Sequence, residues 1–323
     1  MLQKQLQSQE EEKGKRGMMT IGNKTVGVIS AMFNNTASHG GIAETRSMWF
    51  DVLMLVIGIL AVVLNGLLLI AMVRYRSTIF MSKGAYLVAN LAIADVINGL
   101  NLSVLGLKNT FQLPEALTTA VSSIFWTSLV ASFFTIFVMS LERYIAIVFP
   151  FKAQVWLSKT RTIKSCVAVW FIAVLCSACE VVFSDIVSFC LTFIFEITIL
   201  VTLFLYYKIA IKLRQRRTFL TSMQPPRARG TRANANLQRD YQLMTVVVAL
   251  TIITIFTALP YMVATHISCA RKLFTAAKYD PNLQLFLYDN MPVQFMNLVV
   301  NPIVYAWRLP DYRLALLRTI HCR

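Results

Sequence analysis

Long apolar runs alternate with short polar and basic segments along most of the chain. A membrane-spanning helix needs about 20 predominantly apolar residues, and several runs reach that length. The stretch 166–207 contains no Lys or Arg and is long enough for two spans, so we divide it near Phe183-Ser184-Asp185. The expected spans are about 49–73, 84–107, 118–148, two within 166–207, 241–267 and 283–307. The pattern predicts an all-α membrane protein with a seven-transmembrane helix bundle.

Composition supports this prediction. The chain of 323 residues is 57% hydrophobic and only 14% charged, and its mean hydropathy is +0.61. Soluble domains are typically less apolar and more charged. The six cysteines have neither the spacing of a zinc site nor that of a disulfide framework.

The formal net charge of +16 follows the expected topology. Most Lys and Arg residues fall on the side of the bundle that holds Arg74, Lys152, Arg214 and Arg313. Loops rich in Lys and Arg stay on the cytoplasmic side, which places the N-terminus outside and the C-terminus inside the cell. The charge then reflects topology and attraction to anionic membrane lipids, and we expect no nucleic-acid partner.

Polar segments flank and interrupt the spans. Residues 1–48 are polar and include a charge run, which is typical of a disordered extracellular tail. Asn23 and Asn34 begin glycosylation acceptor sequences in this tail, whereas the acceptor sequence at Asn101 lies inside the second span. Between 214 and 239 we expect a flexible basic linker whose two ends continue the flanking helices.

Several polar side chains lie inside the expected spans. Because such groups are costly in a bilayer, they normally face the bundle interior and find partners. The candidates are Asn65, Asp95, Ser132, Asn297 and Asn301. The Asp95 carboxylate needs hydrogen-bond donors, a bound cation or a proton. It is either a polar clip between helices or a cation and water site that changes when the bundle rearranges.

Two prolines lie inside the last two spans. Pro260 stands in FTALPYM and Pro302 in NPIVY. Proline removes a backbone hydrogen bond and kinks a helix. The kinks fit a bundle that moves, but static kinks are also common in membrane helices.

The third span ends in a charged trio, Glu142-Arg143-Tyr144, within SLERYIAIVFP. Charge at this place is either a simple stop signal or a functional element. A stop signal needs only a basic residue at the membrane edge, and Lys152 or Lys159 could provide it. The trio therefore indicates a function of its own.

These motifs occur together and in one order. They are LNGLLLI with Asn65, NLAIAD ending at Asp95, the trio at 142–144, Trp170, YYKI at 206–209, Pro260, NPIVY at 301–305 and DYRL at 311–314. Over residues 49–320 the chain resembles a rhodopsin-like (class A) G-protein-coupled receptor. The resemblance implies a receptor domain at 49–308, a short amphipathic eighth helix and cytoplasmic tail at 309–323, and a multi-pass location in the plasma membrane.

The resemblance also implies roles for the cytoplasmic half of the bundle. Arg143, next to Tyr144, would pair with Glu142 and Asp240 as an ionic lock and meet the G protein on activation. Tyr206 and Tyr305 match tyrosines that swing inward on activation, together with hinges at Pro260 and at Asn301-Pro302. The sodium and water pocket would consist of Asn65, Asp95, Ser132, Asn297 and Asn301. We expect no cofactor apart from a structural sodium ion at Asp95.

Departures from the family pattern indicate one branch of the receptor family. Thr118 stands where the family has its third-span cysteine, the second outer loop is nearly absent, and Thr198 replaces a proline. Together these resemble the melanocortin, adenosine, cannabinoid and lysophospholipid receptors, without identifying a ligand. Ala258 replaces the usual sixth-span tryptophan. Phe125 replaces the amine-binding aspartate and the last span has no lysine, so amine and retinal ligands are disfavoured.

The ligand is expected in the outer half of the bundle. Candidate ligand residues are Phe125, Ser128, Glu196, Tyr261, Met291 and Phe295. Glu196 either faces a cationic ligand group or is protonated and structural, and Phe125 and Met291 are equally consistent with packing. Cys179 and Cys269 are a candidate disulfide at the outer helix ends. Cys322 is a candidate palmitoylation site.

The functional expectation is a receptor, not an enzyme, that binds an extracellular ligand and activates heterotrimeric G proteins, with arrestin as a further partner. Two alternatives remain. A receptor-like scaffold or arrestin-biased protein would keep the fold without activating G proteins. A seven-helix transporter would need a continuous intramembrane path of acids or bases, and only Asp95 and Glu196 are deeply placed.

Overall fold

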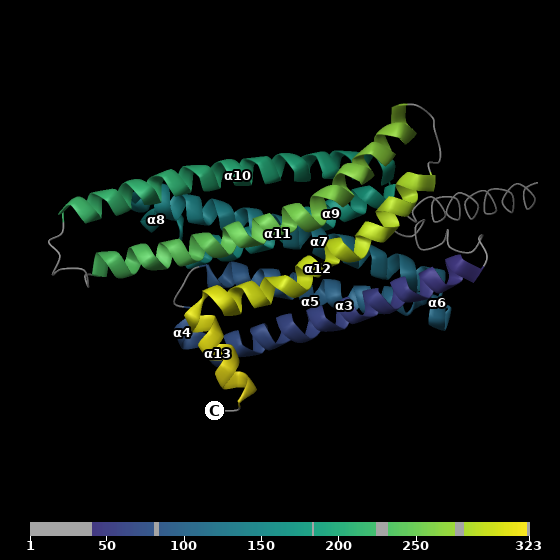
Figure 1. The fold of residues 1–323 in the computed structure, drawn as a ribbon, viewed down its shortest axis with the longest axis horizontal. Helices are drawn as coiled ribbons and strands as arrows, with labels where there is room; N and C mark the ends of the chain where they lie inside the picture. The colour runs from purple at the N-terminus through teal and green to yellow at the C-terminus, as the bar shows by residue number, and fades with distance from the viewer. Residues whose placement is uncertain (1–40, 81–83, 183, 224–231, 275–280, 322–323) are drawn as a thin grey trace, which may run out of the picture.

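The structure is a computed structural model that describes residues 41–80, 84–182, 184–223, 232–274 and 281–321. Seven long helices run roughly along one axis, and helix labels follow Figure 1. The long helices are α3 (Gly41–Arg74), α5 (Ala85–Gly106), α7 (Glu115–Val148), α9 (Lys159–Val182), α10 (Ser184–Met223), α11 (Arg232–Phe274) and α12 (Pro281–Arg308). The short ones are α4 (Arg76–Ile79), α6 (Lys108–Phe111), α8 (Pro150–Trp156) and α13 (Pro310–Ile320).

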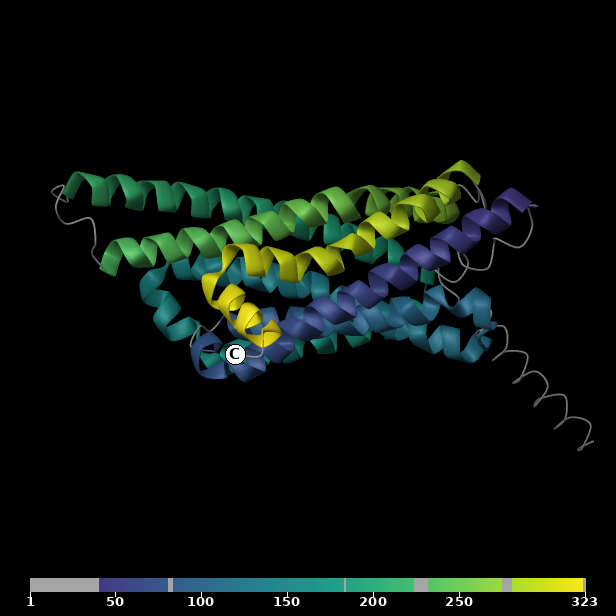
Figure 2. The same cartoon turned by 60° about the horizontal axis from the view of Figure 1, so that its bottom comes forward.

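The predicted seven-helix membrane bundle is confirmed. Within the described ranges, six helices (α3, α5, α7, α9, α10 and α11) are long and apolar enough to cross a membrane. The seventh, α12, has 28 residues and is more polar, because amides such as Gln294, Asn297 and Asn301 lie along it. The helix that follows it, α13, turns away from the axis of α12 (Figures 1 and 2), which agrees with the expected eighth helix.

Burial is reversed relative to a soluble protein. Asn65, Asp95 and Asn301 are fully buried, whereas large apolar side chains such as Phe171 and Leu200 are exposed on the outside of the bundle. Unpaired polar groups are costly in hydrocarbon, and lipid solvates apolar surface. The distribution of side chains is therefore that of a protein that spans a membrane.

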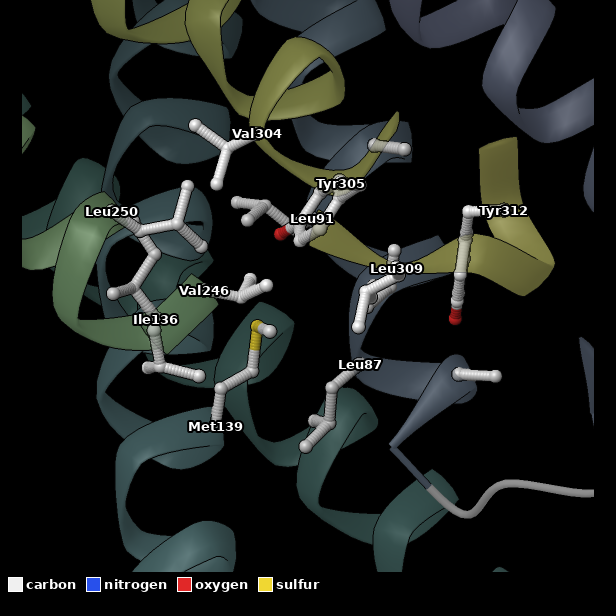
Figure 3. Packing of buried hydrophobic residues seen from close by; sticks show 14 of the residues in the cluster. Leu87, Leu91, Ile136, Met139, Val246, Leu250, Val304, Tyr305, Leu309 and Tyr312 are labelled. Carbon is white, nitrogen blue, oxygen red and sulfur yellow. The ribbon is translucent and has the colours of Figure 1, made fainter. Parts of the chain in front are cut away.

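The central helix of the bundle is α7. It packs against α5, α9, α10 and α11, while α3 packs mainly on α5, and α12 on α11 and α3. An apolar cluster fills the half of the bundle next to α13 (Figure 3). It brings together Leu91 of α5, Ile136 of α7, Leu250 of α11 and Tyr305 of α12. This cluster fixes the positions of four helices around the polar residues described below.

Helix ends differ from the expected boundaries in places. The first long helix begins at Gly41, so residues 41–48, expected in the disordered tail, are helical. Residues 42–48 contain no proline or glycine that would end a helix, and the helix therefore extends beyond the apolar run. The helix α9 ends at Val182 and α10 begins at Ser184, which agrees with the division predicted from the sequence. Both ends of the basic linker continue the helices α10 and α11, as expected.

Candidate functional site

A cavity lies between α7, α10, α11 and α12, and its empty space, including the part open to solvent, is about 690 Å³. Two of the ligand candidates, Tyr261 and Phe295, line it. Ala258 also lines it, so the small side chain at the position of the usual tryptophan leaves room inside the bundle. The remaining lining residues are Trp126, Leu129, Ser132, Phe133, Ile136, Thr192, Phe195, Thr254, Met262, Thr265, Gln294, Asn297 and Leu298.

The other four ligand candidates are not part of this lining. Phe125 is buried with its ring 5.1 Å from that of Phe295, and Met291 is buried with them in a second apolar cluster, separate from the one next to α13. Ser128 donates a 2.6 Å hydrogen bond to Asn98 Oδ1. Phe125, Met291 and Ser128 thus make helix-packing contacts behind the wall of the cavity.

Glu196 has a partner, His266, that the sequence did not indicate. Its carboxylate lies 3.4 Å from Nδ1 of His266 on α11, and both side chains are about one quarter exposed. The rings of Phe189 and Phe193 pack edge-on against the His266 imidazole. This arrangement favours the structural reading of Glu196 as a link between α10 and α11.

Asp95 is the centre of a buried polar cluster. One carboxylate oxygen accepts a 2.9 Å hydrogen bond from Ser132 of α7, and the other accepts a 2.7 Å bond from Nδ2 of Asn301 on α12. Asn65 donates to the carbonyl oxygen of Leu298 at 2.9 Å, and Asn297 donates to Thr254 Oγ1 at 3.2 Å. Of the five polar residues expected to converge, Asp95, Ser132 and Asn301 meet directly, whereas Asn65 and Asn297 bond to other groups. Together their hydrogen bonds link α3, α5, α7, α11 and α12.

The cluster contains oxygen atoms that suit a small hard cation. The buried Oδ1 atoms of Asn65, Asn297 and Asn301 have no hydrogen-bond partner in the described part of the chain. Carboxylate, hydroxyl and amide oxygens are the ligands of hard cations. A single positive charge would balance the single Asp95 carboxylate. The donor set fits the expected monovalent ion, which stays a prediction.

Tyr206 connects three helices in the half of the bundle next to α13. Its hydroxyl lies 2.5 Å from Ser140 Oγ of α7 and accepts a 3.0 Å bond from Thr251 of α11. It is also 3.2 Å from the carbonyl oxygen of Val247. Tyr305, the second expected switch residue, is fully buried beside Tyr312.

The charged trio lies near the C-terminal end of α7. Nη2 of Arg143 forms a 2.7 Å ion pair with Glu142 Oε2, as the first half of the expected lock requires. Asp240 belongs to α11, but its side chain lies outside the described part of the structure. The second half of the lock therefore stays a prediction.

A series of hydrogen bonds between side chains supports a structural role for Trp170. Its indole nitrogen donates a 3.0 Å bond to Asn90 Oδ1, and Asn90 donates a 2.8 Å bond to Thr135. These hydrogen bonds link α9 to α5 and α7. Asn90 and Asn98 were not singled out from the sequence, although both are amides inside an apolar span, the same signal that identified Asn65.

The expected disulfide between Cys179 and Cys269 is wrong. Cys179 is an exposed free thiol on α9, whereas Cys269 is fully buried on α11. The helices that carry them, α9 and α11, each pack against α10. Three further candidates, Asn23, Asn34 and Cys322, lie outside the described residues, so glycosylation and palmitoylation stay predictions.

Fold and site together define a seven-helix membrane bundle with a cavity next to a buried polar cluster. Residues 64–191 match the family of 7 transmembrane receptors (rhodopsin family). The matched segment runs from α3 into α10 and includes Asp95, the trio 142–144 and Trp170. A search of curated proteins found no match. This part of the chain is therefore similar to rhodopsin-family receptors, and the narrower branch stays a prediction.

Proposed function

We propose that the protein is a receptor that binds a ligand in the cavity and activates heterotrimeric G proteins. The observation that carries the proposal is the position of Ser132. This residue lines the cavity and also donates a hydrogen bond to Asp95, which in turn accepts from Asn301 of NPIVY. A molecule in the cavity would therefore contact the polar cluster that joins α5, α7 and α12.

The proposed mechanism is a population shift between two arrangements of the bundle. A ligand changes the balance only by the difference between its affinities for the two arrangements. Asn297 provides a second link, because it lines the cavity and donates to Thr254 of α11. Pro260 lies inside α11, where the missing backbone hydrogen bond would give this helix a hinge. A shift of α12 against α11 would then be transmitted along both helices.

At the cytoplasmic end the response would reach Arg143. In the present structure Glu142 holds this guanidinium by an ion pair and a 3.2 Å hydrogen bond from Nε. Release from Glu142, and from Asp240 in the proposed lock, would free Arg143 for the G protein. Arrestin would meet the same face, and the basic loops around it would contact anionic lipid of the plasma membrane. In this orientation the N-terminus is extracellular.

The Asp95 cluster would hold a sodium ion in one of the two arrangements. Asp95, Ser132 and the unpartnered amide oxygens of Asn65, Asn297 and Asn301 would hold it. The ion would supply positive charge against the buried carboxylate. Ser132 and Asn301 orient that carboxylate by their hydrogen bonds.

A G-protein dissociation panel in cells tests the proposal. Ligand-free activity is read first for each G-protein class, and a ligand library second, with surface expression measured in parallel. We expect a response in at least one class and its loss in Arg143→Ala at equal surface expression. Silence in every class by a chain that reaches the surface would contradict the proposal and favour the scaffold alternative.

A further inference from the structure

The cavity described above has an uncharged lining. Among the described residues that line it, none is Lys, Arg, His, Asp or Glu. Most of its wall is aromatic or aliphatic, with Trp126, Phe133, Phe195 and Phe295 contributed by α7, α10 and α12. A charged group in such a cavity would lose its hydration without gaining a counter-charge. The lining therefore selects against acids and amines.

The three threonine hydroxyls of the lining are already used as donors inside their own helices. Thr192 donates to the carbonyl oxygen of Ser188, and Thr265 to that of Tyr261. Thr254 likewise donates to the carbonyl oxygen of Leu250. These three side chains retain only acceptor capacity toward the cavity.

Gln294 supplies the specific acceptor. It is more than nine-tenths buried, it lines the cavity, and its Oε1 has no partner in the described part of the chain. A buried acceptor without a partner is unfavourable, so it marks a place where a donor from a ligand would be bound. The polar contact and the apolar wall together define the ligand chemistry.

We propose that this cavity binds an uncharged, mainly apolar molecule that donates a hydrogen bond to Gln294 Oε1. The inference rests on the proposed function in that the same cavity would hold the activating ligand. Small-molecule sites are typically concave and mostly apolar with a few placed polar groups, which is the composition of this lining. Ala258 contributes to this space, and a larger side chain at position 258 would fill it.

Direct binding of simple probes tests the inference. The full chain is purified into lipid nanodiscs, and the unfolding temperature is measured as a function of probe concentration. Two neutral alcohols of different shape, 1-decanol and borneol, are compared with decanoate and decylammonium. A ligand that binds the folded state raises the unfolding temperature along a saturable curve. We expect saturation with at least one alcohol and none with either ion.

Matched variants distinguish binding in the cavity from uptake of the probe by the bilayer. Ala258→Trp should abolish the saturable response, and Ala258→Leu should weaken it if the tryptophan variant fails to fold. Val263→Trp is the control, because Val263 lies on α11 with 42% of its surface exposed to the lipid side. Gln294→Leu should weaken alcohol binding about tenfold, the usual effect of losing one hydrogen bond to a buried partner.

Three results would overturn the inference. They are no saturation with either alcohol, binding of the ions equal to that of the alcohols, and equal responses of Ala258→Trp and Val263→Trp. The measurement does not involve a G protein, so it is separable from the proposed function. Saturable alcohol binding without coupling to any G protein would refute only the proposed function. G-protein activation without alcohol binding would refute only the ligand chemistry.

Discussion

Removing the Tyr206 hydroxyl should destabilise the bundle without disturbing its packing. Tyr206→Phe keeps the buried ring and deletes contacts to Ser140, Thr251 and the carbonyl oxygen of Val247. Ser140 and Thr251 also donate to backbone carbonyls of their own helices, each at 2.9 Å. The variant therefore leaves neither hydroxyl without a partner, and only the links between helices are lost.

The expected magnitude follows from these links. Hydrogen bonds between membrane helices contribute about 0.6 kcal/mol on average and up to about 1.7 kcal/mol. Losing the contacts to Ser140, Thr251 and Val247 should therefore cost about 1 to 2 kcal/mol. Tyr207 is the matched control, because it follows Tyr206 directly but is 63% exposed. Tyr207→Phe should cost close to nothing.

The assay is the unfolding temperature of purified protein in nanodiscs, measured for Tyr206→Phe, Tyr207→Phe, Ser140→Ala and the double variant of Tyr206 and Ser140. For soluble domains of 150–250 residues, 1 kcal/mol corresponds to about 2 to 4 °C. We expect a drop of a few degrees for Tyr206→Phe and a non-additive effect in the double variant, because the residues share one hydrogen bond. Equal effects at positions 206 and 207, or strict additivity, would refute the reasoning.

Three further tests address the packing and the polar contacts. Gly58→Ala should lower the unfolding temperature, because its Cβ would lie 2.7 Å from the carbonyl oxygen of a facing glycine on α5. Gly66→Ala should leave it unchanged or raise it, since nothing lies within 4 Å of that Cβ; equal effects would argue against close packing of α3 on α5. Asp95→Asn should abolish the rise in unfolding temperature that we expect with sodium chloride over choline chloride, and a sodium effect that survives would place the ion elsewhere. A double-mutant cycle of Glu196→Gln and His266→Ala should give a coupling of about 0.6 kcal/mol, and zero coupling would show that the pair does not link α10 to α11.

The sequence predicted the helices more reliably than the contacts between them. Apolar length and Lys/Arg placement are properties of a segment itself, so even the division at Phe183 could be located. Convergence at Asp95 could also be anticipated, because a buried carboxylate requires donors, and Ser132 and Asn301 supply them. Helix ends were less certain, since α3 continues outward to Gly41 where the apolar pattern has already ended.

What the sequence could not give is the rotation of each helix about its axis. Apolar residues cover the whole circumference of a membrane helix, so periodicity does not distinguish the cavity wall from the surface that faces lipid. For this reason Tyr261 and Phe295 reach the cavity whereas Phe125 and Met291 pack behind it. The same limit explains why the sequence left Glu196 open between a ligand contact and a structural role, because it does not show that His266 faces this carboxylate.

The small side chain of Ala258 leaves the cavity in contact with the polar cluster. With Ala258 in the wall, the cavity extends to Ser132 and Asn297, two residues that also belong to the Asp95 cluster. A molecule in the cavity and a cation at Asp95 would then compete for, or share, the same side chains. Because linkage between two binding sites is reciprocal, each would change the affinity of the other by the same factor. Direct contact at Ser132 could thus connect the ligand to the polar cluster without a tryptophan at position 258.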